Sequence, residues 1–128
     1  MEQVRLELQP WLWMDQIERA CQHALDDLTP LAVIEECKTG RFLAFVIGGC
    51  LLLILEVAEQ AEQRVLNVRL LAGKGWDEFG ELAMDFTDRM AREQGCAVTR
   101  VQGRPGWLRV LAGNGYKQKA VLMERQND

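Results

Sequence analysis

The fold is decided by the stretch VLNVRLLAGKG, residues 65–75, and by the run WDEFGELAMDFTDRMARE that follows it at residues 76–93. The apolar, partly β-branched start of the first stretch favours a β-strand. From Trp76 onward, apolar residues recur every three or four positions, a spacing typical of a helix with one face against a core. Gly95 ends this helix, and residues 96–102 favour another strand. A strand, a long helix and a strand in this order predict two parallel neighbouring strands.

The apolar stripe of this helix predicts which of its residues are buried. The stripe consists of Trp76, Phe79, Leu82 with Ala83, Phe86 and Met90. Asp77 and Glu78 lie in the first turn and Arg92 in the last, an arrangement that complements the helix dipole. We therefore expect a stable helix that packs through this stripe.

Two further strands precede the central one. Residues 41–47 and 50–58 are apolar runs separated by Gly48-Gly49. This dipeptide suits a two-residue hairpin turn because both glycines can adopt positive φ. The polar residues 59–64 then form a turn into the strand at residues 65–71, which predicts an antiparallel meander of three strands.

The N-terminal part is predicted to hold a strand and two helices. Residues 4–8 alternate apolar and polar side chains, as in a short edge strand, and residues 11–25 have helical spacing. Thr29-Pro30 is a helix start and Gly40 a helix stop, which predicts a second helix over residues 30–39.

Trp11 and Trp13 are two residues apart and cannot face the same core from one helix. Either the helix begins later, or one tryptophan is an exposed anchor of the kind enriched at interfaces.

The C-terminal part is predicted to hold a short helix over residues 105–112 and a final strand over residues 116–125. With 128 residues the chain has the size of one domain. We therefore expect residues 1–128 to form a single α+β domain. Its central sheet is mixed and mostly antiparallel, with one parallel strand pair and helices on both faces.

Composition and charge narrow the function classes. The net charge of −4 divides into 4 basic and 11 acidic side chains in residues 1–63, and 11 basic and 8 acidic in residues 64–128. The excess of basic residues in the second part is too small for a typical nucleic-acid-binding domain, so we do not expect nucleic acid as a partner. No apolar run is long enough to span a membrane.

The cysteines and the histidine predict no metal site. Cys21, Cys37, Cys50 and Cys96 have no Cys-x-x-Cys spacing, and His23 is the single histidine. We expect four buried thiols in a reducing compartment and a solvated histidine.

The stretch from Val65 to Tyr116 resembles the GNAT superfamily of acyl-CoA-dependent N-acyltransferases. In that family a strand enters a loop of pattern Gln/Arg-x-x-Gly-x-Gly/Ala, whose amides hold the coenzyme pyrophosphate at the start of the next helix. Residues 70–75, LLAGKG, occupy this place. The resemblance implies that Gly73, Lys74 and Gly75 bind acetyl-CoA. The alternative is a strand-to-helix turn that needs glycine dihedrals.

The resemblance also implies weakened chemistry. The family takes its general acid from a tyrosine in the last helix, and that position is Leu111 here. Glu56 is the carboxylate on the meander that can point into a cleft, but we expect it to be a structural or chance carboxylate, and we assign no catalytic residue. Tyr116 is expected to pack in the core.

The string QGRPGWLRVL, residues 102–111, is also similar to GNAT-like proteins encoded among the structural genes of tailed bacteriophages. The first hypothesis is therefore a catalytically degenerate GNAT-fold protein of phage type, found in the host cytoplasm or the virion. It would bind phage structural proteins through Arg104, Trp107 and Arg109, with no cofactor. Alternatively, Trp107 fills a cofactor groove that has been lost. The alternative is an active acetyl-CoA-dependent N-acetyltransferase.

Overall fold

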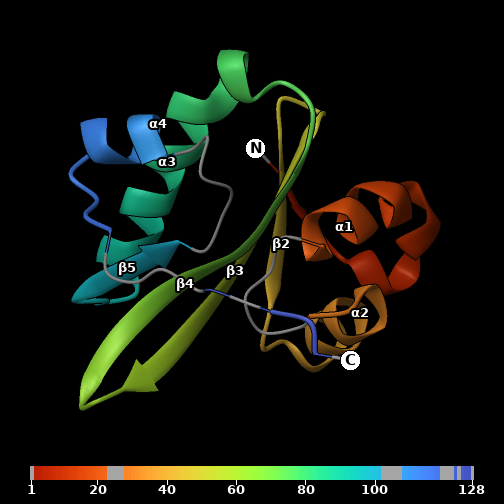
Figure 1. Ribbon diagram of the computed structural model, residues 1–128, viewed down its shortest axis with the longest axis horizontal. Helices are drawn as coiled ribbons and strands as arrows, with labels where there is room; N and C mark the ends of the chain where they lie inside the picture. Colours follow the sequence, from red (N-terminus) through yellow and green to blue (C-terminus); the bar gives the residue numbers. More distant parts are fainter. Residues whose placement is uncertain (1, 23–27, 102–107, 119–122, 124, 128) are drawn as a thin grey trace.

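A computed structural model describes residues 2–22, 28–101, 108–118, 123 and 125–127. Within these ranges the chain forms five β-strands, four α-helices and two short 3-10 helices (Figure 1). In chain order they are β1 (Glu2–Val4), η1 (Leu6–Leu8), η2 (Pro10–Leu12), α1 (Met14–Cys21), α2 (Pro30–Thr39), β2 (Leu43–Ile47), β3 (Leu51–Gln60), β4 (Gln63–Gly73), α3 (Trp76–Glu93), β5 (Val98–Val101) and α4 (Leu108–Gly113).

The strands form one mixed sheet in the order β1-β2-β3-β4-β5. Neighbouring strands from β1 to β4 are antiparallel, whereas β4 and β5 are parallel, with Val65 opposite Val98. The predicted α+β class and parallel pair are therefore confirmed. The pair arises because the 18 residues of α3 return the chain to the edge at which β4 began.

Helices cover both faces of the sheet, as the sequence predicts. Helices α1 and α2 lie on one side, and α3 and α4 lie on the other (Figure 1). Two apolar clusters fill the layers between helices and sheet. One contains Ile17, Val33 and Phe42, and the other contains Leu53, Leu66 and Ala83. Alternate residues of β3 feed the two clusters, which is why almost the whole strand is buried.

Helix α2 begins and ends where its capping residues predict. The Thr29 hydroxyl accepts a hydrogen bond of 3.1 Å from the amide of Ala32, and Pro30 takes the first helical position. Gly40 ends the helix with a φ of 85°. The capping side chain and the left-handed glycine thus fix both ends.

The β2–β3 turn contains three residues, one more than predicted. Ile47 pairs with Leu51, so Cys50 joins Gly48 and Gly49 in the loop. Both glycines have positive φ, 61° and 71°, as their sequence predicts. A β-carbon on Gly48 would lie 2.6 Å from the Phe79 ring, so this turn also packs against α3.

The N-terminal prediction is wrong in two respects. The edge strand is β1, at Glu2–Val4, and Leu6–Leu8 turns into a 3-10 helix that buries Leu6. The α-helix begins only at Met14. Both alternatives given for Trp11 and Trp13 are therefore correct. The helix begins later than residue 11, and Trp11 is 69% exposed while Trp13 packs against the core.

Helix α3 has the predicted bounds, and most of its predicted stripe packs in the core. Ala83 belongs to the apolar cluster around Leu53, and the stripe residues packed against that cluster are Trp76, Phe79, Phe86 and Met90. Leu82 is the exception, because it is 45% exposed, whereas Met84, not expected in the core, is 2% exposed. Phe86 lies at the border, with its ring 4.8 Å from that of Phe45.

Only part of the predicted C-terminal structure lies within the described residues. Helix α4 overlaps the helix expected over residues 105–112 and ends one residue later, at Gly113. Of the expected final strand, residues 116–118, 123 and 125 are described and are not in a strand, and the others lie outside the described residues.

Other expectations concern thiols and membranes. All four cysteines are free thiols and are half-buried rather than fully buried, and His23 lies outside the described residues. Among the residues that the structure describes, no group of three metal-binding side chains occurs and no helix is long and apolar enough to cross a membrane.

Candidate ligand-binding site

Strand β4 extends beyond its parallel partner. It pairs with β5 only at residues 65–68, and within the described chain its last residues have no partner on that side. On its other side the pairing shifts between Ile54 and Leu55 of β3, so that Arg69 is an extra residue in β4. Such a bulge strengthens the local twist of the strand. The end of β4 therefore separates from β5 and leads into α3.

The loop between β4 and α3 needs its two glycines. Gly73 and Gly75 have φ values of 103° and 94°, a region that other residues rarely adopt. A β-carbon on Gly73 would clash with the carbonyl oxygen of Cys50, and one on Gly75 would lie 2.7 Å from the Cys50 sulfur. The Lys74 amide donates a hydrogen bond of 3.3 Å to the same carbonyl. The packing of the β2–β3 turn against this loop thus explains why both positions are glycine. This agrees with the alternative of a strand-to-helix turn that needs glycine dihedrals.

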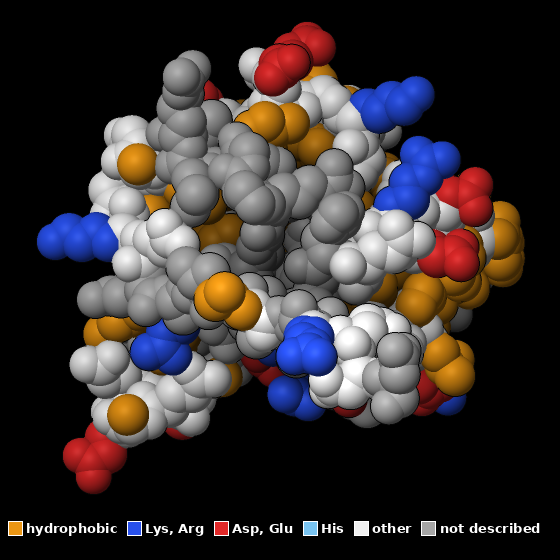
Figure 2. Space-filling view, viewed as in Figure 1, with side chains coloured by type: hydrophobic (Ala, Val, Ile, Leu, Met, Phe, Trp, Pro, Cys, Tyr) orange, Lys and Arg blue, Asp and Glu red, His pale blue; other side chains and the backbone are white. Residues whose placement is uncertain are grey.

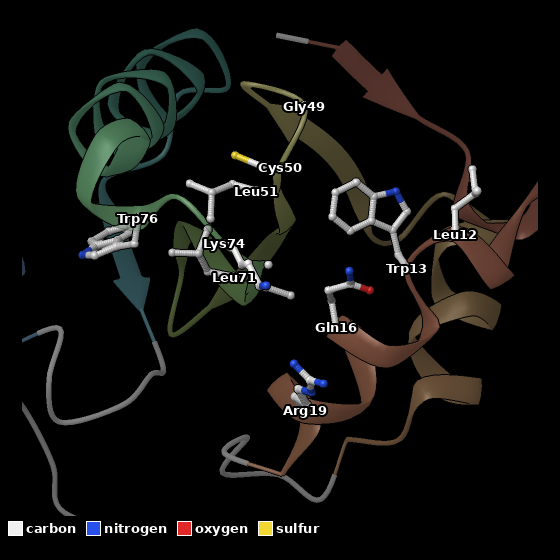
Figure 3. A pocket seen from close by; sticks show the side chains of 12 residues that line it. Leu12, Trp13, Gln16, Arg19, Gly49, Cys50, Leu51, Leu71, Lys74 and Trp76 are labelled. Atoms are coloured by element: carbon white, nitrogen blue, oxygen red, sulfur yellow. The ribbon is translucent and has the colours of Figure 1, made fainter.

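A pocket of about 680 Å³ opens beside this loop (Figure 3). Its walls come from η2 and α1 on one side and from the β2–β3 turn and the end of β4 on the other. The lining residues are Leu12, Trp13, Gln16, Arg19, Gly49, Cys50, Leu51, Leu71, Ala72, Gly73, Lys74 and Trp76. Segments more than fifty residues apart in the sequence thus build one site.

The polar side chains of the pocket are cationic or neutral. Lys74 extends from its loop toward Gln16 and Arg19 of α1 (Figure 3). None of the twelve lining residues is an aspartate or a glutamate. Asp77 and Glu78, which crowd the first turn of α3 in the sequence, are exposed and do not line the pocket. Two cations with no carboxylate between them favour an anionic ligand.

The buried carboxylate of Glu56 lies outside this pocket. Its Oε2 atom accepts a hydrogen bond of 2.7 Å from Arg41, and its Oε1 atom accepts one of 3.0 Å from Asn67. Arg69 lies 3.7 Å from the same Oε1 atom. Both oxygens are engaged and the side chain is 4% exposed, so Glu56 is held in place by its arginine and asparagine partners. The expectation of a structural carboxylate agrees with these contacts.

Neither of the two C-terminal positions singled out in the sequence offers an acid to the pocket. Leu111 is 9% exposed and packs as an apolar residue. The Tyr116 hydroxyl is buried and makes no hydrogen bond with any residue in the described ranges. Burial, with a smaller contribution from Asp88, raises the pKa of Tyr116 to about 12. Tyr116 is therefore a packed phenol, as expected.

The structure brings together only some of the residues singled out in the sequence. Gly73 and Lys74 line the pocket, and Gly75 precedes α3 without lining it. Arg104 and Trp107 of the expected partner surface lie outside the described residues, as does the side chain of Arg109. Sequence reasoning missed Trp13, Gln16 and Arg19. Their signal is the spacing of three residues, which places them on one side of α1.

Known proteins were compared with the chain at the levels of sequence and structure. No protein-family model and no curated protein sequence matches it. Solved structures do match, and the following three are acetyltransferases.

An acetyltransferase from Trypanosoma brucei is 11% identical and has a TM-score of 0.64, with 98% of this chain and 97% of that chain covered. An aminoglycoside acetyltransferase from an uncultured soil metagenomic sample, solved with sisomicin, is 14% identical over 99% and 95% of the two chains, with a TM-score of 0.63. A GCN5-related N-acetyltransferase from Ralstonia eutropha JMP134 is 17% identical over 88% and 94%, with a TM-score of 0.58.

These likenesses establish the fold. The chain has the GNAT fold, because its five-stranded mixed sheet and its helices superpose on nearly the whole length of these acetyltransferases. The identities are too low to carry over an activity. The expected GNAT-like fold is thus confirmed, whereas the phage-type resemblance stays a prediction.

Proposed function

We propose that this chain is an acyl-coenzyme A-binding protein of the GNAT fold whose acyl-transfer chemistry is weak or lost. The observation that carries the proposal is the pocket beside the β4–α3 loop, with Arg19 and Lys74 in its lining and no carboxylate among its lining residues.

The donors in the pocket fit a diphosphate. The Lys74 ammonium and the Arg19 guanidinium carry positive charge, and the Gln16 amide adds neutral donors. The same pocket is lined by Trp13 and Leu71, which suit the apolar part of a pantetheine arm. These residues would hold the coenzyme, which supplies an activated thioester when it is bound.

Among the described residues, the pocket lining lacks the side chains usually used for proton transfer. Transfer of an acyl group to an amine needs a base for the amine proton and an acid for the leaving thiolate. None of the twelve lining residues is a carboxylic acid, a histidine or a tyrosine. Glu56 is engaged by arginines, and the phenol of Tyr116 is buried away from the lining. Binding without efficient turnover follows from this arrangement.

The second candidate is an active N-acetyltransferase. Its support is the near-complete structural coverage of acetyltransferase chains. On this alternative, proton transfer would pass through water, as it can where no side chain is within reach of the reacting group.

Calorimetry with acetyl-CoA tests the binding proposal. We expect saturable binding to the wild-type chain and at least a tenfold weaker affinity for Lys74→Glu and for Arg19→Glu, because each change places a carboxylate among the ligand phosphates. Lys38→Glu, on an exposed position of α2 outside the pocket lining, is the matched control and should bind normally. Pantetheine, which lacks the diphosphate, should bind much more weakly than acetyl-CoA.

A thiol-release assay with a panel of amines separates the two candidates. We expect no release of coenzyme A above the uncatalysed rate. Steady turnover that Lys74→Glu abolishes would establish the enzyme instead. The absence of acetyl-CoA binding, or equal binding by Lys74→Glu and Lys38→Glu, would refute both candidates at this site.

The role in a phage particle stays a prediction at this point. The proposed binding of phage structural proteins through Arg104, Trp107 and Arg109 is independent of the pocket, and no observation above bears on it.

A further inference from the structure

Large apolar side chains are exposed together at the N-terminal side of the molecule. Leu8 is 60% exposed, Trp11 69%, Leu12 57% and Leu31 69%. Leu8 ends η1, which packs against α2, the helix that carries Leu31. Figure 2 shows hydrophobic side chains on this side of the molecule, over the region of α1 and α2. We call these four residues the N-terminal apolar surface.

The segment that carries this surface is fixed in place. Leu6 and Ile17 are 2% and 0% exposed, and Trp13 packs against the same cluster. The anchors on both sides of Trp11 hold the two 3-10 helices against the sheet. Trp11 and Leu12 are therefore exposed on a segment that is anchored to the core on both sides. Exposed apolar groups concentrated in this way are typical of interaction sites.

Acidic residues border the N-terminal apolar surface. Glu35 follows Leu31 by four residues on the same face of α2. Asp15 lies in the first turn of α1, which directly follows the 3-10 helix that carries Trp11. Both carboxylates are exposed, and Figure 2 shows acidic side chains among the hydrophobic ones here. Glu18, on α1 with Asp15, is exposed as well. These carboxylates attract cations to the border of the apolar residues.

We propose that the N-terminal apolar surface docks a cationic amphipathic segment of another protein. Apolar side chains of such a segment cover Trp11 and Leu31, while its lysines or arginines meet Asp15 and Glu35. An exposed tryptophan is among the residue types that contribute most to binding energy, and recognition of an amphipathic helix by an apolar surface is a recurring mode. The proposal goes beyond coenzyme binding and does not depend on it.

Charge argues against the other occupants. A symmetric contact between two copies of this surface would set Asp15 and Glu35 against the same carboxylates of the partner, and like charges across an interface are unfavourable. An anionic lipid surface would be repelled for the same reason.

Calorimetric titration of the full chain with a synthetic helical peptide of leucine and lysine tests the proposal. We expect saturable binding that weakens at least tenfold in Trp11→Ser and in Leu31→Ser. Leu82→Ser is the matched control, because Leu82 is 45% exposed on α3, across the sheet. The same peptide with glutamate in place of lysine should not bind. The charge-reversed variant Glu35→Lys should weaken binding of the lysine peptide and leave the fold intact.

Hydrogen exchange and sedimentation test the location of the site and the identity of its occupant. Hydrogen exchange should show protection by the lysine peptide at residues 6–13 and 30–36, with none in α3. Equal loss of affinity in Leu31→Ser and Leu82→Ser, or protection confined to other segments, would refute the site. If sedimentation shows a dimer that Trp11→Ser dissociates, the occupant is a second copy and the proposal is wrong.

Discussion

The Nε atom of Arg41 donates a hydrogen bond of 2.7 Å to the Glu56 carboxylate, which is almost fully buried. Arg41 and Arg69 also lie 5.8 and 5.3 Å from the Phe42 ring, so two cations flank one aromatic side chain. Glu56, through its charge and its hydrogen bond, raises the pKa of Arg41. This contact joins the residue after α2 to the centre of β3. It therefore holds the α1–α2 layer against β3, the strand next to the bulge at Arg69 of β4.

Loss of the Glu56 carboxylate should therefore destabilise the fold. Glu56→Ala leaves the guanidinium of Arg69, which is 14% exposed, without this partner, and breaking a buried pair in this way costs about 3–5 kcal/mol. Glu59→Ala is the control, because its pair with Arg64 joins two exposed side chains and such pairs contribute about 0–1 kcal/mol. Urea unfolding measures both. Equal losses would mean that the Glu56 cluster is not structural.

Helix α3 offers a second test. Met84→Ala should lower the free energy of unfolding by about 2–5 kcal/mol, because Met84 is 2% exposed and its removal leaves a cavity. Leu82→Ala should cost less than about 1 kcal/mol, because Leu82 is 45% exposed. Thermal unfolding of the two variants measures the difference. A larger loss in Leu82→Ala than in Met84→Ala would mean that Leu82 faces the core, as the sequence predicts.

This helix shows how far sequence patterns reach. Its ends are predictable because glycines and charged residues act locally, and the capping residues of α2 do the same. Most of its buried face is predictable as well, since the stripe from Trp76 to Met90 packs in the core apart from Leu82. Leu82 and Ala83 both fit an apolar stripe, and only contact with the sheet selects Ala83. The start of α1 fails for a related reason. The period of three to four at residues 11–25 does not distinguish 3-10 turns from α-helix. The structure does, because the amides of Leu12 and Trp13 donate hydrogen bonds to carbonyl oxygens only three residues earlier.

The third prediction compares the stability of alanine variants at two turn glycines, Gly49 before β3 and Gly73 at the end of β4. Gly73→Ala should destabilise the chain far more than Gly49→Ala. Both residues have positive φ, which costs other residues about 1–2 kcal/mol. At Gly49 no atom lies within 4 Å of the added carbon, whereas at Gly73 that carbon clashes with the Cys50 carbonyl. Melting temperatures of the two variants test this, and a similar loss in both would contradict the packing of the two loops.

The candidate site was only half predictable. Gly73 and Lys74 are visible in the sequence because a glycine pair between a strand and a helix is a local signal. Arg19 and Gln16 belong to a helix more than fifty residues away, and only the packing of α1 over β4 brings them to Lys74. In the sequence they look like solvated positions of an amphipathic helix. Their role becomes visible only when the pocket shows that three neutral or cationic groups converge without a carboxylate.

The ionisation of Tyr116 gives the last prediction, and a single tyrosine in the chain makes it directly measurable. Burial, and to a smaller extent Asp88, raises the pKa of this phenol from 10.0 to about 12. Absorbance of the folded chain should therefore show a tyrosinate midpoint near 12, and the chain in urea should show one near 10.

Because the raised pKa belongs to the folded state, the stabilising contribution of neutral Tyr116 is complete below pH 10 and is lost as the pH rises toward 12. Tyr116→Phe should remove this loss between pH 10 and 12. Asp88→Asn should lower the folded midpoint only slightly, since burial is the larger cause. A folded midpoint at 10 would show that the hydroxyl reaches solvent, which contradicts the burial of its oxygen atom.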